Sequence, residues 1–505
     1  MTFRAVLPLL SLAILGAAAF VTACVDEGPP APEEEEPEKE VANATPPGRP
    51  RQPAVIEEEE YEGKRSAEPG TLLRAGFVGL NSVTSDDYAV YTVRDADGGT
   101  RTRLEVMPLG GGEPTVLIER MVSTDVVARR DRVVAFWTKV DPQTRIGELS
   151  IWTAAHGVKK VASASSTSFF AATADGTRIA YSVDATAGGT AVAVSDTKPG
   201  AAGSVVIPTV GGGCAPRVGF AGGRLFTGTC TTSAAATIRT VGPGETTAKT
   251  LLPNAFPDWS ASSDGKIVLI RSQEERTATV RTVPDNVSTV IDTGVLESYL
   301  AADGKSVLYR TQTGLVKRSP TTNPAPVVLA DEVRSMPSVA EDLQHILISS
   351  GPPDTKNTSV TRTDLSLVAV SRANAAVPIL EKPTGSARGF TGDGRFAVYL
   401  TDIGDSGGTG TLRARGVAAD APEKVIGEKV QLPRIVPGSS NAKVAFVDRP
   451  VRRSNEVLVD LLVADLAKDG APAVVMTQVK SYAVTSTKAV YALGKDGGLW
   501  AKPLP

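Results

Sequence analysis

One pattern of polar and apolar residues recurs along most of the chain. Each copy holds a short polar turn, usually with Asp-Gly, and then an alternating run rich in β-branched and aromatic residues. The clear copies are TADGTRIAYSV (173–183), SSDGKIVLIRS (262–272), AADGKSVLYRT (301–311) and TGDGRFAVYLT (391–401), and weaker copies begin at residues 84, 128, 220, 340, 438 and 485. Successive turns lie about 45 residues apart, a period that is typical of β-propeller blades when the repeat consists of strands and turns.

The central runs of these repeats are apolar on both alternating faces, as in KIVLI (266–270) and RFAVYL (395–400). A sheet with one wet face would show strict alternation, so these strands are predicted to be buried on both faces. Radially stacked blades provide such burial because each sheet packs between two neighbours. Later strands, such as VSTVID (287–292), are more polar, and 48 Gly and 35 Pro interrupt any helical period. We therefore predict an all-β fold, a β-propeller of four-stranded blades.

The repeat domain is assigned to residues 71–505 and holds ten repeats, more than the four to eight blades of most propellers. One large ring and two smaller rings are both compatible with this count. The last repeat ends at GGLWAKPLP (497–505) with three strands only, whereas TLLRA (71–75) precedes the first repeat. We predict that this N-terminal strand completes the last blade, because closure removes an exposed sheet edge.

The segment Pro257-Asp258-Trp259-Ser260, followed by Asp264-Gly265-Lys266, resembles the TolB-type propeller repeat, and the architecture is also similar to WD repeats. The resemblance covers roughly residues 76–505. It implies protein or peptide binding in the periplasm, or gating of substrates where a hydrolase domain follows, and no such domain follows here. The Asp-Gly turns themselves are predicted to be structural, because Gly tolerates positive φ and Asp caps a turn.

The first 24 residues predict the compartment. Arg4 is followed by an apolar run at 5–20, and the small residues Val21-Thr22-Ala23 stand before Cys24. The run is short for a spanning helix, which needs about 20 apolar residues. It resembles the bacterial lipoprotein signal with its lipobox, here VTAC, although an ordinary signal peptide with an incidental cysteine is the alternative.

The lipoprotein resemblance implies that residues 1–23 are cleaved and that the thiol of Cys24 is lipidated. Several acyl chains on one residue anchor a protein firmly to a membrane. We therefore expect a protein of the cell envelope, anchored by lipid to a bacterial membrane, the outer membrane being favoured. The side of that membrane is left open.

Residues 24–70 differ in composition from the repeats. Positions 25–70 hold fourteen Asp or Glu, five Lys or Arg and nine Pro, which gives a net charge of −9. Such a segment cannot bury enough apolar area to offset its ordering entropy, so we predict a disordered acidic tether, with an acidic binding tail as the alternative. The repeats carry a mild positive charge without a visible stripe of Lys and Arg, so no nucleic-acid partner is expected.

Two further cysteines remain, Cys214 and Cys230. An even pair outside the cytoplasm favours a disulfide. Cys214 precedes the first strand of the fourth repeat and Cys230 ends the second strand of that repeat. Antiparallel neighbours bring such ends together, so we predict a Cys214–Cys230 disulfide.

One pair of motifs is similar to the signatures of trypsin-like serine proteases. These are Thr153-Ala154-Ala155-His156 and Gly404-Asp405-Ser406-Gly407-Gly408. A triad would need His156 as the base and Ser406 as the nucleophile, together with an Asp. The two motifs fall in turns of the second and eighth repeats, and Gly157 stands where the protease has a cysteine. We interpret the likeness as chance and predict no catalytic residue.

The sequence has few signals for a metal site or a cofactor. The chain has only two histidines, His156 and His345, which excludes a His-rich metal site. Asp95-Ala96-Asp97-Gly98 is faintly similar to the start of a calcium loop, but the downstream Glu is missing, and a hairpin turn is the simpler interpretation. No phosphate loop or dinucleotide motif is visible, so no metal and no cofactor are predicted.

These observations favour a non-enzymatic envelope protein that binds a protein, peptide or glycan or acts as a scaffold. The alternative is a propeller-type glycan hydrolase or lyase, which would need Asp or Glu pairs around the central channel. A purely structural spacer is also compatible with the sequence.

Overall fold

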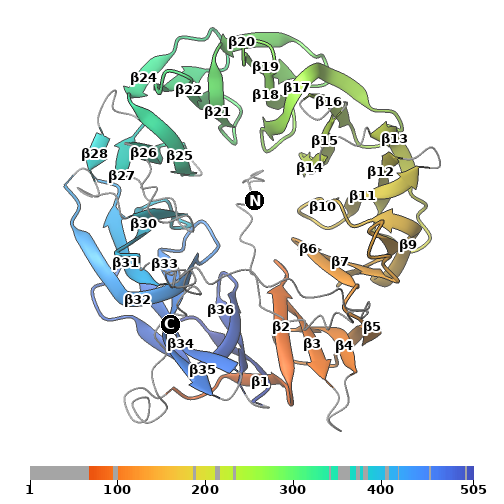
Figure 1. Ribbon diagram of the computed structural model, residues 1–505, viewed down its shortest axis with the longest axis vertical. Coiled ribbons are helices and arrows are strands. Elements are labelled where there is room, and N and C mark those ends of the chain that lie inside the picture. The colour runs from red at the N-terminus through yellow and green to blue at the C-terminus, as the bar shows by residue number, and fades with distance from the viewer. Residues whose placement is uncertain are drawn as a thin grey trace, which may run out of the picture. The chain divides into compact units, whose positions relative to one another are not determined.

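The computed structural model describes residues 67–94, 101–185, 189–210, 216–230, 235–340, 343–350, 364–370, 376–378, 385–403, 409–418, 420–453, 456–494 and 497–505. The regular structure in these ranges consists of strands, which form four-stranded antiparallel blades. Ten blades follow one another around a single ring (Figure 1). The prediction of an all-β propeller is confirmed. Of the two arrangements that the sequence allowed, the structure has the single large ring. Within the described ranges, no helix is long and apolar enough to cross a membrane.

The first five blades follow the chain in order, each from the axis of the ring outward. Blade 1 holds β2 (Val78–Val83), β3 (Tyr88–Arg94), β4 (Thr102–Pro108) and β5 (Thr115–Met121); blade 2 holds β6 (Val126–Arg130), β7 (Val133–Thr138), β8 (Ile146–Thr153) and β9 (Gly157–Ser166); blade 3 holds β10 (Phe170–Ala172), β11 (Arg178–Ala185), β12 (Gly189–Asp196) and β13 (Ser204–Val210). Blade 4 holds β14 (Arg217–Ala221), β15 (Arg224–Cys230), β16 (Ala236–Val241) and the first half of β17 (Lys249–Ala261); blade 5 holds the second half of β17, β18 (Ile267–Ser272), β19 (Ala278–Thr282) and β20 (Ser288–Asp292).

The remaining blades repeat this order, and two more long strands are shared between neighbours. Blade 6 holds β21 (Val295–Leu300), β22 (Ser306–Thr311), β23 (Val316–Pro320) and β24 (Val327–Ala330); blade 7 holds β25 (Val333–Val339), β26 (His345–Ser350), β27 (Asp364–Ala369) and β28 (Ala376–Pro378); blade 8 holds β29 (Ser386–Phe390), β30 (Phe396–Thr401), β31 (Gly410–Gly416) and the first half of β32 (Glu423–Ile435). Blade 9 holds the second half of β32, β33 (Lys443–Arg453), β34 (Glu456–Asp465) and the first half of β35 (Ala473–Val484); blade 10 holds the second half of β35, β36 (Lys488–Leu493), β37 (Leu499–Pro503) and β1 (Thr71–Arg74).

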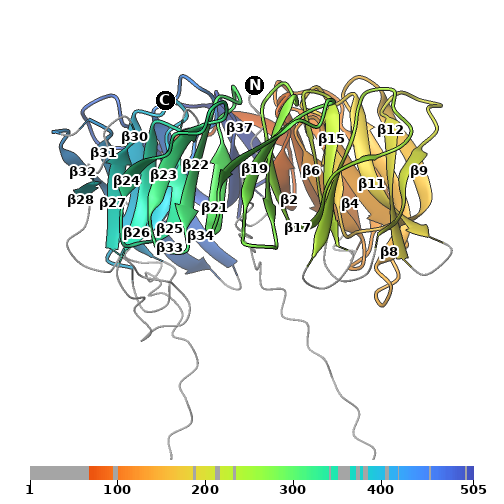
Figure 2. The ribbon, with the colours of Figure 1, turned by 90° about the horizontal axis from the view of Figure 1, so that it is seen from above.

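The second strands are buried on both faces, as the sequence predicted. In β18, Val268 shares a buried cluster with Phe226 of blade 4, whereas its neighbour Leu269 shares one with Tyr309 of blade 6. Successive side chains of a strand point to opposite faces, so each central strand packs against both neighbouring blades. The core is therefore a series of interfaces between blades, seen edge-on in Figure 2.

The predicted N-terminal strand closes the ring. β1 pairs antiparallel with β37 and becomes the outermost strand of blade 10. Leu73 is buried in a cluster that joins Val78 of blade 1 to Val490 of blade 10. Nη2 of Arg74 lies 3.2 Å from Oε1 of Glu105, a blade 1 carboxylate whose side chain is only 1% exposed. The closure prediction is confirmed, and an ion pair accompanies it.

The Asp-Gly turns join the first and second strands of the blades. Gly265 has a φ of +71°, and Oδ1 of Asp264 accepts hydrogen bonds from Ser262 Oγ (2.7 Å) and from the Lys266 backbone N–H (3.0 Å). The turns at Asp175, Asp303 and Asp393 repeat the bond to the backbone two residues on. The structural role predicted for these residues is confirmed.

Acid should weaken these turns. The hydrogen bonds from Ser262 and Lys266 hold the pKa of Asp264 below its ordinary value. A carboxyl group with a depressed folded pKa stabilises the fold above its unfolded pKa, about 4, and loses that contribution as the pH falls through the folded value. We expect Asp264→Ala to lower the free energy of unfolding at pH 7 by at most about 1 kcal/mol, because the side chain is half exposed, and by less at about pH 3.

Urea denaturation at both pH values measures this difference. Asp285→Ala is the matched control, since Asp285 is exposed in a turn and accepts no hydrogen bond within the described part of the chain. A cost of Asp264→Ala that stays constant between the two pH values would contradict the capping role.

Candidate functional site: the axial arginine cluster

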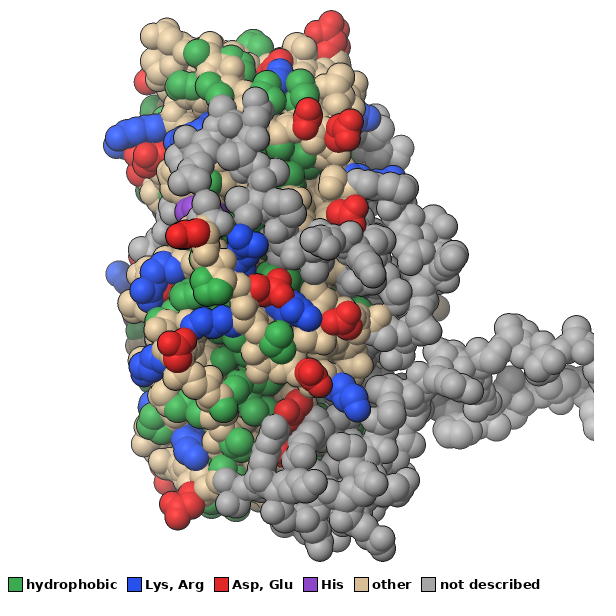
Figure 3. Space-filling model, turned by 90° about the vertical axis from the view of Figure 1, so that its left-hand side faces the viewer, with side chains coloured by type: hydrophobic (Ala, Val, Ile, Leu, Met, Phe, Trp, Pro, Cys, Tyr) green, Lys and Arg blue, Asp and Glu red, His purple; other side chains and the backbone are tan. Residues whose placement is uncertain are grey.

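The outer rim of the ring is poorly suited to adding a strand from a partner. In nine blades the pairing of the third and fourth strands contains a register shift, and in blade 7 only three residue pairs join β27 to β28. Such bulges distort an edge strand and hinder its pairing with another chain. The side of the ring drawn in Figure 3 carries acidic and basic side chains interspersed with apolar ones, so charges of one sign do not gather there.

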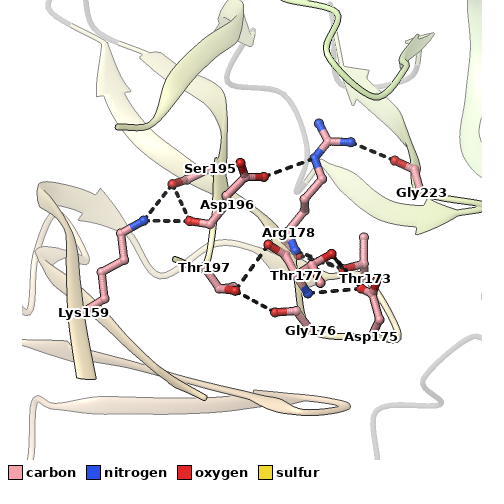
Figure 4. A network of polar contacts seen from close by, with 10 residues as sticks. All are labelled: Lys159, Thr173, Asp175, Gly176, Thr177, Arg178, Ser195, Asp196, Thr197 and Gly223. Carbon is pink, nitrogen blue, oxygen red and sulfur yellow. Dashed lines mark hydrogen bonds and ion pairs between the residues drawn. The ribbon is translucent and has the colours of Figure 1, made fainter. Parts of the chain in front are cut away.

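Polar side chains also form networks that hold neighbouring blades together. Figure 4 shows one network that joins blades 2, 3 and 4. Nζ of Lys159 donates to Ser195 Oγ (3.1 Å) and to the Asp196 carbonyl (2.6 Å), and Nη1 of Arg178 donates to the Gly223 carbonyl (2.9 Å). Burial lowers the pKa of Lys159, but its ammonium group already donates hydrogen bonds from blade 2 to blade 3. We assign this network to stability.

The first strands, which surround the axis of the ring in Figure 1, differ from the rim in charge. They carry seven basic side chains, namely Arg129, Arg130, Arg217, Arg334, Arg388, Arg434 and Lys480. Carboxylates occur on two of these strands. Asp258 lies 2.5 Å from Arg271, and Glu297 lies 2.7 Å from Arg310, each arginine coming from the second strand of the same blade. These two acids are thus already paired, and basic side chains outnumber carboxylates on the described inner strands.

Three axial arginines come from three different blades and have exposed side chains. Arg130, next to one of them, is exposed too, and its Nε donates to the Phe170 carbonyl of blade 3 (3.3 Å). Arg129 on β6, Arg388 on β29 and Arg434 on β32 are exposed, and no ion pair joins them to a carboxylate among the described residues. We call these three residues the axial arginine cluster. By comparison, Arg217 stacks on Trp259, 5.7 Å from the ring centroid, and Lys480 lies 4.2 Å from the centroid of Phe77.

Two observations show that the members of the axial arginine cluster lie near one another, although they come from blades 2, 8 and 9. The positive charge of Arg434 acts on Arg129. A Cβ added at Gly389, next to Arg388, would lie 3.9 Å from a side-chain carbon of Ile435, next to Arg434. The strands that carry these residues therefore meet around the axis.

The protein packed around Arg129 and Arg388 disfavours their charge, although both side chains reach solvent. Burial by the surrounding protein lowers the pKa of Arg129; Asp131 opposes this, and the positive charges of Arg130 and Arg434 add to it. Burial likewise lowers the pKa of Arg388. Arginines remain charged at neutral pH because their ordinary pKa lies far above neutral. An exposed positive charge that no ion pair joins to a carboxylate in the described ranges marks a candidate binding site for an anion.

Two members of the cluster make further contacts with neighbouring strands. Arg129 donates to the carbonyl oxygen of Val83 in blade 1. The guanidinium of Arg434 lies over the ring of Tyr482, 5.1 Å from its centroid. The positive charge of Arg434 is attracted by the ring, and its side chain also hydrogen-bonds to Tyr482.

The structure places His156 between β8 and β9, in the turn that the sequence predicted. Ser406 and Asp95-Ala96-Asp97-Gly98 lie outside the described residues. The structure therefore does not test the likeness to serine proteases or the likeness to a calcium loop. No group of three or more His, Cys, Asp or Glu in the described ranges is placed to hold a metal ion.

The cysteine predictions are open. Cys24 and Cys214 lie outside the described residues, so lipidation and the Cys214–Cys230 disulfide stay predictions. Cys230 is buried at the end of β15. Arg217 on β14 pairs with Gly228 on β15, so the two strands of the predicted bridge do run antiparallel.

The axial arginine cluster was not predicted from the sequence. Its members come from three different repeats, and the mild net charge of the repeats hides them. One signal was available in the sequence. All three arginines stand a few residues before the turn that joins the first and second strands, and the first strand is the inner strand of a blade.

No protein-family model matches the sequence, and no curated protein matches it. Solved structures do match. The putative TolB from Agrobacterium tumefaciens is 15% identical, over 51% of this chain and 94% of that chain, with a TM-score of 0.26. The β-propeller domain of Cps50 (Swd1) from Myceliophteria thermophila is 13% identical, over 59% of this chain and 99% of that chain, with a TM-score of 0.30.

The tricorn protease is 10% identical over 85% of this chain, with a TM-score of 0.31, and the match covers 52% of that protease, about half of its length. Likenesses at these identities and TM-scores carry no argument about activity or partners. A TolB protein is among the similar structures, as the Asp-Gly repeat suggested.

Proposed function

We propose that this protein is a membrane-anchored envelope lipoprotein whose propeller binds a protein or peptide at the axial arginine cluster. The observation that carries the proposal is the exposed charge of Arg129, Arg388 and Arg434 on inner strands of a closed ring, which no ion pair joins to a carboxylate in the part of the chain that the structure describes. The signal sequence with its VTAC motif supports the lipid anchor and the envelope location.

A binding role is favoured over catalysis. Acid-base hydrolysis of a glycan needs two carboxyl groups facing one substrate bond. Among the described first strands, Asp258 and Glu297 are the carboxylates, and each is held by an arginine. Glu297 also accepts a hydrogen bond from the Met336 backbone N–H at 3.0 Å. These contacts support a structural role for both acids, and we propose no enzymatic activity.

Affinity capture from detergent-solubilised envelope, with the full chain as bait, tests the proposal. Three baits are compared: the wild type, the axial variant Arg388→Gln/Arg434→Gln, and the rim variant Arg101→Gln/Arg120→Gln. The rim variant removes the same charge from exposed positions away from the inner strands. We expect one stoichiometric envelope protein with the wild type and the rim variant, and its loss with the axial variant.

Equal recovery with all three baits, or recovery of nothing, would contradict the proposal. Hydrolysis of an envelope polymer by the wild type would favour the enzyme instead.

A further inference from the structure

The excess charge at the axis is carried by arginine almost throughout, with Lys480 as the one lysine among the seven basic residues of the described inner strands. Arginine offers planar, paired N–H donors that match the two oxygens of a carboxylate, whereas lysine is a point charge. The site is therefore suited to carboxylate side chains rather than only to negative potential.

The backbone at the axis adds a second preference. β6 and β29, which carry Arg129 and Arg388, each stand at the end of a sheet and pair on one side only, with β7 and β30. β6 and β7 pair without a register shift, whereas the pairing of β29 with β30 shifts between Ala387 and Gly389, around Arg388. The regular edge of β6 therefore presents backbone N–H and C=O groups that an extended peptide can bind. A sugar or a lipid headgroup does not use such an edge in this way.

From these two features we infer that the axial arginine cluster binds an extended peptide segment rich in Asp and Glu, with its carboxylates on Arg129, Arg388 and Arg434. The inference rests on the proposed function and names the chemistry of the partner. Because the three arginines come from blades 2, 8 and 9, one segment must carry several acids to engage them together. A single carboxylate would bind weakly.

The test uses fluorescently labelled hexaglutamate and hexaserine peptides, titrated with the full chain and followed by anisotropy. We expect hexaglutamate to bind and hexaserine not to bind. Binding should weaken as the salt concentration rises from about 50 mM to about 300 mM, because exposed charges are screened. The titration is repeated on a chain that lacks the acidic residues 25–66, so that competition by these residues is measured.

Three variants separate charge from geometry. Arg388→Gln/Arg434→Gln should weaken hexaglutamate binding by about ten-fold or more, since two charge-assisted contacts are lost. Arg388→Lys/Arg434→Lys keeps the charge without the planar donors and should restore only part of the affinity. The rim variant Arg101→Gln/Arg120→Gln should bind like the wild type. Circular dichroism and thermal unfolding confirm that all three variants fold.

Equal affinity of the axial and rim variants would overturn the inference, as would the absence of hexaglutamate binding in both chain forms. Polyphosphate that binds at the axial cluster when hexaglutamate does not would also overturn it, in favour of a phosphate ligand. These outcomes differ from a failure of the proposed function, in which the envelope capture itself shows no dependence on Arg388 and Arg434.

Discussion

Removal of residues 70–75, which include β1, is expected to lower the free energy of unfolding of the propeller by about 4 kcal/mol or more. Burial of a leucine side chain such as Leu73 contributes about 2 kcal/mol. Loss of Arg74 takes a partner from Glu105, which is 1% exposed, and a buried charge that loses its partner costs about 3 kcal/mol. Arg103 stays 3.6 Å from this carboxylate and offsets part of the cost.

Thermal and urea unfolding measure this effect. Deletion of six residues within the acidic segment, 33–38, is the control for shortening the chain. Because the deletion can abolish folding altogether, Leu73→Ala is measured as well, with an expected cost of about 2 to 3 kcal/mol. Unfolding of both variants at the wild-type midpoint would mean that β1 does not close the ring.

A methyl group at Gly222 should destabilise the ring by about 3 kcal/mol or more. Gly222 lies in the turn between β14 and β15 with a φ of +55°, and an added Cβ would lie 1.9 Å from the carbonyl oxygen of Asp264 in the next blade. A left-handed conformation alone costs a residue with a side chain about 1 to 2 kcal/mol. At Gly222 the clash with backbone adds to this cost, because neither blade can move without disturbing its own interfaces.

Gly244→Ala is the matched comparison. Gly244 also has a positive φ, +74°, but an added Cβ would meet nothing within 4 Å. We therefore expect Gly244→Ala to cost only about 1 kcal/mol, the conformational part alone. Equal midpoints for the two variants in urea would show that the turns of blades 4 and 5 are not in tight contact.

The two sets of predictions bear on different parts of the molecule. Closure and turn contacts make the ring rigid, and a rigid ring holds arginines from separate blades at fixed positions around one axis. Preorganised donors bind an anion with less loss of entropy than donors on mobile loops. Stability variants such as Gly222→Ala should therefore weaken acidic peptide binding only when the ring unfolds.

Much of the fold was predictable because its signals are local. The Asp-Gly turn at 264–265 needs an acceptor and a positive φ, and both requirements are visible in the residue types. Burial on both faces follows from apolar residues at successive positions of KIVLI. The closing strand was predictable by counting, since the last repeat lacks one strand and TLLRA precedes the first.

By itself the sequence determined the repeat, the turn chemistry and the closing strand, because each depends on residues close together in the chain or on a simple count. The tertiary structure alone decided that ten blades share one ring, since the angle between neighbouring blades depends on how their side chains pack. It also decided the candidate site. Arg129, Arg388 and Arg434 are far apart in the sequence, and only the closed ring brings their charges around one axis.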